Sequence, residues 1–343
     1  MNVDDHQFDE NLTASEVMIE EIVLMICNQE FPTNNDDLRV LSNIQDSYLQ
    51  KLTLEWEKIT PIFAQQLLAR LEQLATEDAL LDFHKIFLLA IAHTDTAVRI
   101  LAVRGLGLEE QPRYIKLLCR YLENDSAASV RAEIADVLGQ WVVSMEFGLL
   151  SEEDAEELQA TLTGRIDDFE EDEEVRGRAL EALGALSDED IGELIGESYE
   201  LGSHRLRVAA IRAMGRSASE TWLQILIFNF DDEDSEIRAA AATAAGSLLM
   251  DDAVTPLAML LDDSEIDVQV AAIQALGEIA NDESEKILIR LKNETLNSEI
   301  IKVVEESIAQ VHLMDTPVLD QGISIDDVSE SNSNILDGRS GDQ

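Results

Sequence analysis

The chain has 343 residues and a formal net charge of −47, from 24 lysines and arginines against 71 aspartates and glutamates. A surface of that sign repels phosphate backbones, so we expect no direct binding of nucleic acid. The chain is 45% hydrophobic but only 5% aromatic, with 5 prolines. This composition favours an all-α protein with many small-residue helix contacts over a sheet sandwich.

The cysteines and the lengths of the apolar runs indicate the cellular compartment in which the protein is expected to act. Cys27 and Cys119 form no disulfide framework or CxxC pair, and the first ten residues lack a basic region followed by an apolar run. No uninterrupted apolar run approaches the roughly 18 to 20 residues that span a bilayer. We therefore expect a soluble, cytoplasmic protein with reduced thiols and no membrane association.

Residues 14–79 are predicted to form an N-terminal helical cap. Apolar-periodic segments in this range are separated by the sequence PTNN and by the Thr60–Pro61 step, both of which are typical helix boundaries. Residues 1–13, which precede the cap, are expected to be disordered.

From residue 98 onward, one ten-residue pattern recurs. Successive copies begin 32, 45, 31, 31, 31 and 32 residues apart, so the long step contains one period and an insertion of about 14 residues. The copies are VRILAVRGLG (98–107), VRAEIADVLG (130–139), VRGRALEALG (175–184), LRVAAIRAMG (206–215), IRAAAATAAG (237–246), VQVAAIQALG (268–277) and a degenerate IIKVVEESIA (300–309).

Positions within the motif predict how its helix packs. The first, fifth and ninth positions are apolar, as in Val130, Ile134 and Leu138, and lie on one helix face that we expect to be buried. Small residues at the eighth position and glycine at the tenth allow either the close approach of a neighbouring helix or a turn at the helix end. We expect each unit to end in a tight turn.

A second apolar-periodic run precedes each copy, so each period holds two helices. The turn between them carries a capping residue three positions before the motif, at Asp95, Asp172, Ser203 and Asp234. The sequence thus predicts an all-α fold over residues 80–312, a right-handed α-solenoid of stacked antiparallel helix pairs.

This helix pair resembles the HEAT repeat, most closely the short variety found in phycobilin-lyase (phycobilisome-lyase-type) subunits and bacterial scaffold proteins. The resemblance implies a fold more than a function, since such arrays serve many roles. Gln269 and Ile301 stand where the motif has arginine, and Ala309 replaces the glycine. We interpret the last unit as a carboxy-terminal cap.

Residues 313–343 scatter isolated apolar residues among Asp, Ser, Asn and Gly, and we expect a disordered acidic tail there. The stretch Val318–Ile325 has the composition of a linear binding motif, although a solvating tail is the interpretation that we favour.

An arginine column occupies the second motif position. One interpretation is an anion-binding ladder. The other, which we favour, is structural: forked guanidinium donors pair with carboxylates of the acidic turns. The column comprises Arg99, Arg131, Arg176, Arg207 and Arg238.

The fourth and seventh motif positions are expected to line the concave surface of the solenoid. The acidity collects at the turns instead, because residues 151–174 hold twelve acids against Arg165 alone. Such acidic rims steer a basic partner, although solvation or adaptation to high salt explains the same charge. The candidate partner-binding residues on the concave surface are Arg104, Arg178, Glu181 and Arg212.

The insertion near residues 141–154 carries three further candidates for partner binding, Trp141, Met145 and Phe147. Aromatic and methionine side chains are good interface anchors, and an irregularity in a regular array is a natural place for specificity. Packing of these residues against the next helix is the competing interpretation and the one that we favour.

The sequence offers no catalytic, metal-binding or cofactor-binding motif. Its five histidines stand apart, with no HExxH and none of the His-Glu pairs of di-iron helical-repeat hydroxylases. A P-loop, a GxSxG elbow and a calcium loop are also lacking. We expect no catalytic residue, no metal and no cofactor.

Three functional hypotheses follow. The leading one is a non-enzymatic scaffold or adaptor that holds a protein partner, with a basic partner favoured by the acidic rims. The resemblance implies an alternative, a phycobilin lyase-like subunit that acts in tetrapyrrole attachment to a phycobiliprotein, with Arg104, Arg178 and Arg212 best placed to hold propionates. The third is an acidic mimic of nucleic acid. The sequence does not indicate an oligomeric state.

Overall fold

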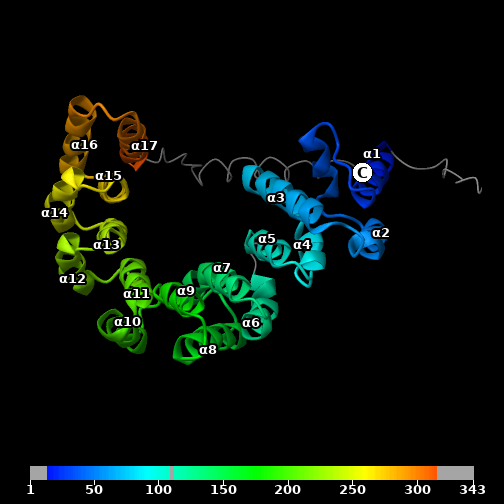
Figure 1. The fold of residues 1–343 in the computed structure, drawn as a ribbon, viewed down its shortest axis with the longest axis horizontal. Coiled ribbons are helices and arrows are strands. Elements are labelled where there is room, and N and C mark those ends of the chain that lie inside the picture. Colours follow the sequence, from blue (N-terminus) through cyan, green and yellow to red (C-terminus); the bar gives the residue numbers. More distant parts are fainter. Residues whose placement is uncertain (1–13, 109–111, 315–343) are drawn as a thin grey trace, which may run out of the picture.

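A computed structural model of the chain describes residues 14–108 and 112–314. Helices dominate these two ranges, and no β-strand forms within them. Figure 1 shows that the helices follow one another along a curved array in two rows, one on the inner side of the curve and one on the outer side. The predicted all-α solenoid of stacked helix pairs is confirmed, whereas the segments predicted to be disordered lie largely outside the described residues.

The inner row contains all seven copies of the motif, preceded by one further helix, and each inner helix contacts the next along the row. The inner helices are α3 (Pro61–Glu77), α5 (Thr96–Gly107), α7 (Ala128–Glu146), α9 (Glu173–Leu183), α11 (His204–Arg216), α13 (Ser235–Ser247), α15 (Ile266–Ile279) and α17 (Ser298–Met314).

The outer row contains the first helix of each pair, in several cases flanked by a short 3₁₀ segment. The outer α-helices are α4 (His84–Ala90), α6 (Ile115–Asn124), α8 (Glu152–Asp167), α10 (Glu189–Leu201), α12 (Leu223–Phe228), α14 (Val254–Met259) and α16 (Asp282–Glu294). The 3₁₀ segments are η2 (Pro112–Tyr114), η3 (Glu220–Trp222), η4 (Asn229–Asp231), η5 (Asp251–Ala253) and η6 (Leu260–Asp262).

The amino-terminal end of the array is covered by α1 (Ala14–Cys27), η1 (Asn35–Leu41) and α2 (Asp46–Trp56). Helix α1 contacts η1 and α2, and η1 contacts α3. A left-handed residue, Asn43 with φ 51°, lies between η1 and α2 and separates these two elements.

The motif positions pack as the sequence predicts. Val130, Ile134 and Leu138 are fully buried, since they share one face of α7. The four predicted capping side chains each accept a hydrogen bond from a backbone N–H in the first turn of α5, α9, α11 and α13. These bonds satisfy donors that a helix start leaves unpaired.

The motif glycines serve the close approach of neighbouring helices, which is one of the two roles that the sequence left open for them. A Cβ built on Gly215 would lie 2.6 Å from the Cα of Ala244, and one built on Gly246 would lie 2.6 Å from the Cα of Ala275. In the five units from Gly139 to Gly277, the tenth position therefore rests on the small eighth-position residue, alanine or serine, of the next unit. Only a residue without a side chain allows so close an approach.

The turns after three inner helices use left-handed residues other than glycine. Ala218, Leu249 and Ala280, which follow α11, α13 and α15, have φ values of 49°, 54° and 52°. A side chain at such a position brings Cβ close to the following carbonyl oxygen. Each of these turns therefore holds local strain that glycine would relieve.

Replacing Ala280 by glycine is accordingly expected to raise the free energy of unfolding by about 0.5–1 kcal/mol. Urea denaturation of the full chain measures the change. The matched control is Ala155→Gly within α8, which should lower the free energy of unfolding by about 1 kcal/mol because its backbone is helical. A loss of stability in both variants would contradict the account of this turn.

The insertion lengthens one helix pair. Helix α7 has 19 residues and α8 has 16, against 11 in α9 and 13 in α10 and α11. Since α7 continues seven residues past Gly139, its end extends about 10 Å beyond the motif. The chain then reverses through Gly148, with φ 65°. We call residues 143–152 the hairpin tip.

Candidate functional site

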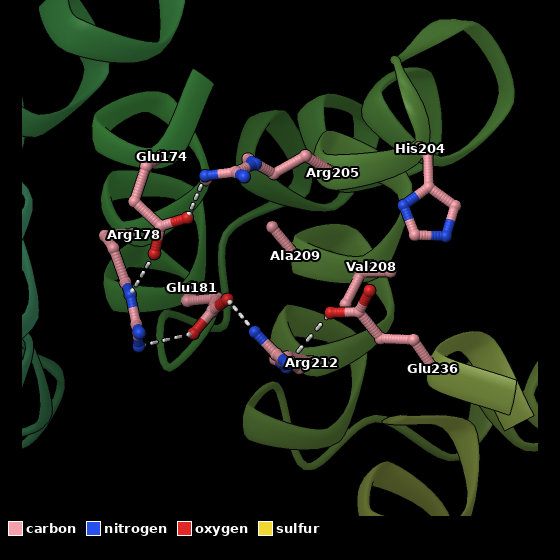
Figure 2. A pocket seen from close by; sticks show the side chains of 10 residues that line it. Glu174, Arg178, Glu181, His204, Arg205, Val208, Ala209, Arg212 and Glu236 are labelled. Atoms are coloured by element: carbon pink, nitrogen blue, oxygen red, sulfur yellow. Dashed lines mark hydrogen bonds and ion pairs between the residues drawn. The ribbon is translucent and has the colours of Figure 1, made fainter. Parts of the chain in front are cut away.

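Three residues per inner helix line the concave surface at the centre of the array. On α9 they are Glu174, Arg178 and Glu181, spaced i, i+4 and i+7, so they lie on one helix face. The equivalent positions on α11 include Arg205 and Arg212. Figure 2 shows these side chains pointing towards one another across the space between the two helices.

A polar pocket of about 310 Å³ lies between these helices. Glu174 accepts hydrogen bonds from Arg178 Nε at 3.1 Å and from Arg205 Nη1 at 2.6 Å. Glu181 likewise lies 3.2 Å from Arg212 Nη1 and 3.6 Å from Arg178 Nη1. Each carboxylate thus bridges two guanidinium groups, as the dashed lines in Figure 2 show for this network.

The charge network extends along the concave surface in both directions. Towards the amino terminus, Arg178 pairs with Asp136 at 3.3 Å, and Arg104 forms a forked pair with Glu133 at 2.7 and 3.0 Å. Towards the carboxyl terminus, Arg212 lies 3.8 Å from Glu236 on α13. The three arginines predicted for partner binding are therefore each paired with carboxylates of this chain.

Burial governs the ionisation of Glu181, whose side chain is 13% exposed. Desolvation raises the pKa of this carboxyl above its usual range, while the charges of Arg212 and Arg178 act in the opposite direction. Both arginines are thus already paired with a buried carboxylate of the chain.

Beyond α11, the fourth and seventh motif positions of the next two inner helices carry no charged side chain. The fourth and seventh motif positions of α13 and α15 are Ala240, Thr243, Ala271 and Gln274. The two alanines are buried, and the two polar side chains are exposed. The charge on this face of α13 and α15 is therefore limited to Glu236 and Asp267, which immediately precede the two motif copies.

The arginine column is largely structural, as predicted. Arg99 makes a forked pair with Asp125 at 2.7 and 2.8 Å, and Arg238 makes the same pair with Asp263 at 2.8 Å for both bonds. Arg131 and Arg207 pair with Glu171 and Asp232. Arg176 differs, because it donates to the Ile166 carbonyl at 3.0 Å and lies over the Phe169 ring.

The Arg99–Asp125 pair makes stability depend on pH. Burial alone would raise the pKa of Asp125, but hydrogen bonds from Arg99 and the Ala127 amide, with the nearby arginine charges, lower it overall. A lowered pKa in the folded state stabilises the fold above the unfolded value of about 3.9. This contribution is lost as the pH falls through the folded pKa.

Replacing Asp125 by asparagine should therefore lower the free energy of unfolding by about 2 kcal/mol at pH 7. The deficit should shrink as the pH falls below about 4, where the native carboxylate is also neutralised. Urea denaturation at several pH values measures both effects. The exposed Asp231, changed to asparagine as a control, should stay within about 0.5 kcal/mol of the parent at every pH.

The three predicted anchors in the insertion occupy different environments. Trp141 is only 2% exposed, which corrects its prediction as a partner contact, because its ring belongs to the core. Met145 is half-buried against that core. Phe147 is 74% exposed at the hairpin tip. Trp141 therefore packs in the core, as the favoured interpretation expected, whereas the exposed side chain of Phe147 is accessible to a partner.

The residue that immediately precedes each motif copy was not among the predicted site residues. Glu174, Arg205 and Glu236 occupy this position, and all three line the pocket. The helical period does indicate this position. The residue before the motif lies four positions before the fourth motif residue and seven before the seventh, so all three share the concave helix face.

The described part of the chain shows no group of three or more His, Cys, Asp or Glu side chains placed to hold a metal ion. Among residues 14–108 and 112–314, no helix has the length and apolarity needed to cross a bilayer. Cys27 and Cys119 are both free, and burial raises the pKa of the Cys119 thiol to about 11. Such a thiol is a poor nucleophile at neutral pH.

Comparison with protein families assigns HEAT repeats to residues 160–245 and 227–309. These ranges hold five of the seven motif copies. The search of curated proteins gave no significant match.

Several solved structures resemble the chain in fold. A chain of the complex of CpcE and CpcF of phycocyanin lyase from Nostoc sp. PCC7120 is 16% identical, with a TM-score of 0.43 over 66% of this chain and 94% of that one. Importin beta is 15% identical, with a TM-score of 0.43 over 87% of this chain and 45% of its own. An engineered protein is 20% identical, with a TM-score of 0.37 over 58% and 96%. Identities this low concern the fold alone.

Proposed function

We propose that this chain, which matches HEAT repeats over residues 160–245 and 227–309, is a non-enzymatic scaffold or adaptor for a basic protein partner, and that it acts in the cytoplasm. Stacked helix pairs create an extended surface that no single unit could offer. The contacts are expected from the concave surface, including Arg104, Arg178, Glu181 and Arg212, and from the acidic turns at the edges of the array.

The observation that carries the proposal is the distribution of charge. The arginines of the column and of the concave surface are largely held by the chain's own carboxylates. Many turn acids remain exposed, among them Glu170, Glu173, Asp231 and Glu233. The edges therefore carry an uncompensated negative field, which attracts a basic partner and speeds its association.

The same pairing bears on the tetrapyrrole alternative. A propionate bound at Arg104, Arg178 or Arg212 would compete with a carboxylate that is already in place. Displacement would leave that carboxylate without its partner, at a cost in free energy. No observation favours this role over a scaffold.

Affinity capture from native lysate with the full chain tests the proposal, at low and at high salt, with mass spectrometry and a visible absorption spectrum of the eluate. We expect a basic protein that elutes as salt rises, because salt screens exposed charges. A pigmented eluate would support the tetrapyrrole role instead. If any polyanion releases the partner, and if binding does not require the concave residues, the result would favour the hypothesis that the protein is an acidic mimic of nucleic acid.

A further inference from the structure

The hairpin tip presents apolar side chains to solvent. Val143, Phe147 and Leu149 are 41%, 74% and 73% exposed. The tip exists only because α7 and α8 are longer than the helices around them. Apolar side chains that project together from an edge are typical of an interaction surface, whereas a single exposed one is ordinary.

Two grooves continue from the hairpin tip along the same edge. One, of about 300 Å³, lies between the α7–α8 hairpin and the turn after α9. The other, of about 640 Å³, lies between α10 and the turn after α11. They share Leu186, Ser187 and Asp188, so they form one continuous surface. Its apolar lining includes Met145 and Trp222.

The charge of this groove has a single sign. No lysine, arginine or histidine lines either part. Glu146 accepts a hydrogen bond from the Ser187 amide at 3.2 Å, which ties the end of α7 to the turn after α9. The acids that line the groove are Glu146, Glu152, Glu156, Asp188, Glu189 and Glu193.

We propose that the hairpin tip and this acidic groove bind a short cationic segment of the partner, one in which leucine or aromatic residues alternate with lysine or arginine. The apolar residues would pack on Phe147 and Leu149, and the cations would face Glu152, Glu156 and Asp188. Charge complementarity selects this occupant. A second copy of the chain would bring the same negative charge to the contact, and an anionic membrane would be repelled.

This inference rests on the proposed function and identifies the form of the partner. The test is selection from a display library of random twelve-residue peptides on the full chain, followed by fluorescence anisotropy with the enriched peptides. We expect enriched sequences rich in Lys or Arg and in large apolar residues. Their affinity should fall about thirtyfold in the Phe147→Ser/Leu149→Ser variant and at least fivefold in Glu152→Gln/Glu156→Gln.

The matched control is Leu201→Ser, an equally exposed apolar residue (83%) at the other end of α10, which should leave binding unchanged. Peptides that lack basic residues, a library without enrichment, or equal loss in the control would overturn the inference. A captured basic protein that binds the hairpin variants with full affinity would also overturn it, while leaving the scaffold function in place. Loss of all salt-dependent capture would instead remove the proposed function.

Discussion

Replacing Leu183 by aspartate is expected to lower the free energy of unfolding by about 5 kcal/mol, which is a large part of the stability of an ordinary domain. Leu183 is fully buried at the end of α9, a helix that contacts α7, α8 and α11. The substitution places a carboxylate without a partner in the buried core of the array, and it also removes apolar contacts. Thermal unfolding followed by circular dichroism measures the loss.

The control for this variant is Leu201→Asp. Leu201 is 83% exposed, so its substitution should change the free energy of unfolding by no more than about 0.5 kcal/mol. An unchanged melting temperature for Leu183→Asp would mean that the buried face of the repeat is assigned wrongly.

Replacing Gly215 by alanine should cost about 3 kcal/mol, although alanine usually favours a helix. The added Cβ would lie 2.6 Å from the Cα and 2.8 Å from the Cβ of Ala244. Because these atoms belong to the backbone and its first side-chain carbon, no rotamer change can move them away. The two inner helices would have to separate, which disturbs every contact between α11 and α13.

Gly164→Ala provides the matched control. This glycine also lies in a helix, α8, but a Cβ built there meets nothing within 4 Å. The substitution should raise the free energy of unfolding by about 0.5–1 kcal/mol, the usual gain from alanine in a helix. Urea denaturation compares the two variants, and a gain in both would refute the role of Gly215 in helix packing.

Much of the fold follows from the periodicity of the sequence. The spacing of Val130, Ile134 and Leu138 predicted a buried face, and the capping residues Asp95 and Asp234 lie where predicted. Local rules suffice here, because each unit makes the same contacts with its neighbours. The role of the glycine was not settled by these rules, since helix approach and turn formation both select for a missing side chain.

The candidate site was predicted only in part. Periodicity placed Arg178, Glu181 and Arg212 on the concave surface, but it could not show that they pair with one another and with Glu174. Pairing depends on the distance between neighbouring inner helices, which the close glycine contacts set. Trp141 and Phe147 are six residues apart in the insertion, yet one is buried and the other exposed, because α7 ends between them.

If the negative edges of the array attract a basic partner, the rate of association with that partner should depend strongly on salt. Stopped-flow mixing of the full chain with the captured partner, over a series of salt concentrations, gives the rate constant. We expect it to fall by an order of magnitude or more between low and high salt, because screening removes the long-range attraction. A rate constant that does not change with salt would show that the negative edges do not attract the partner.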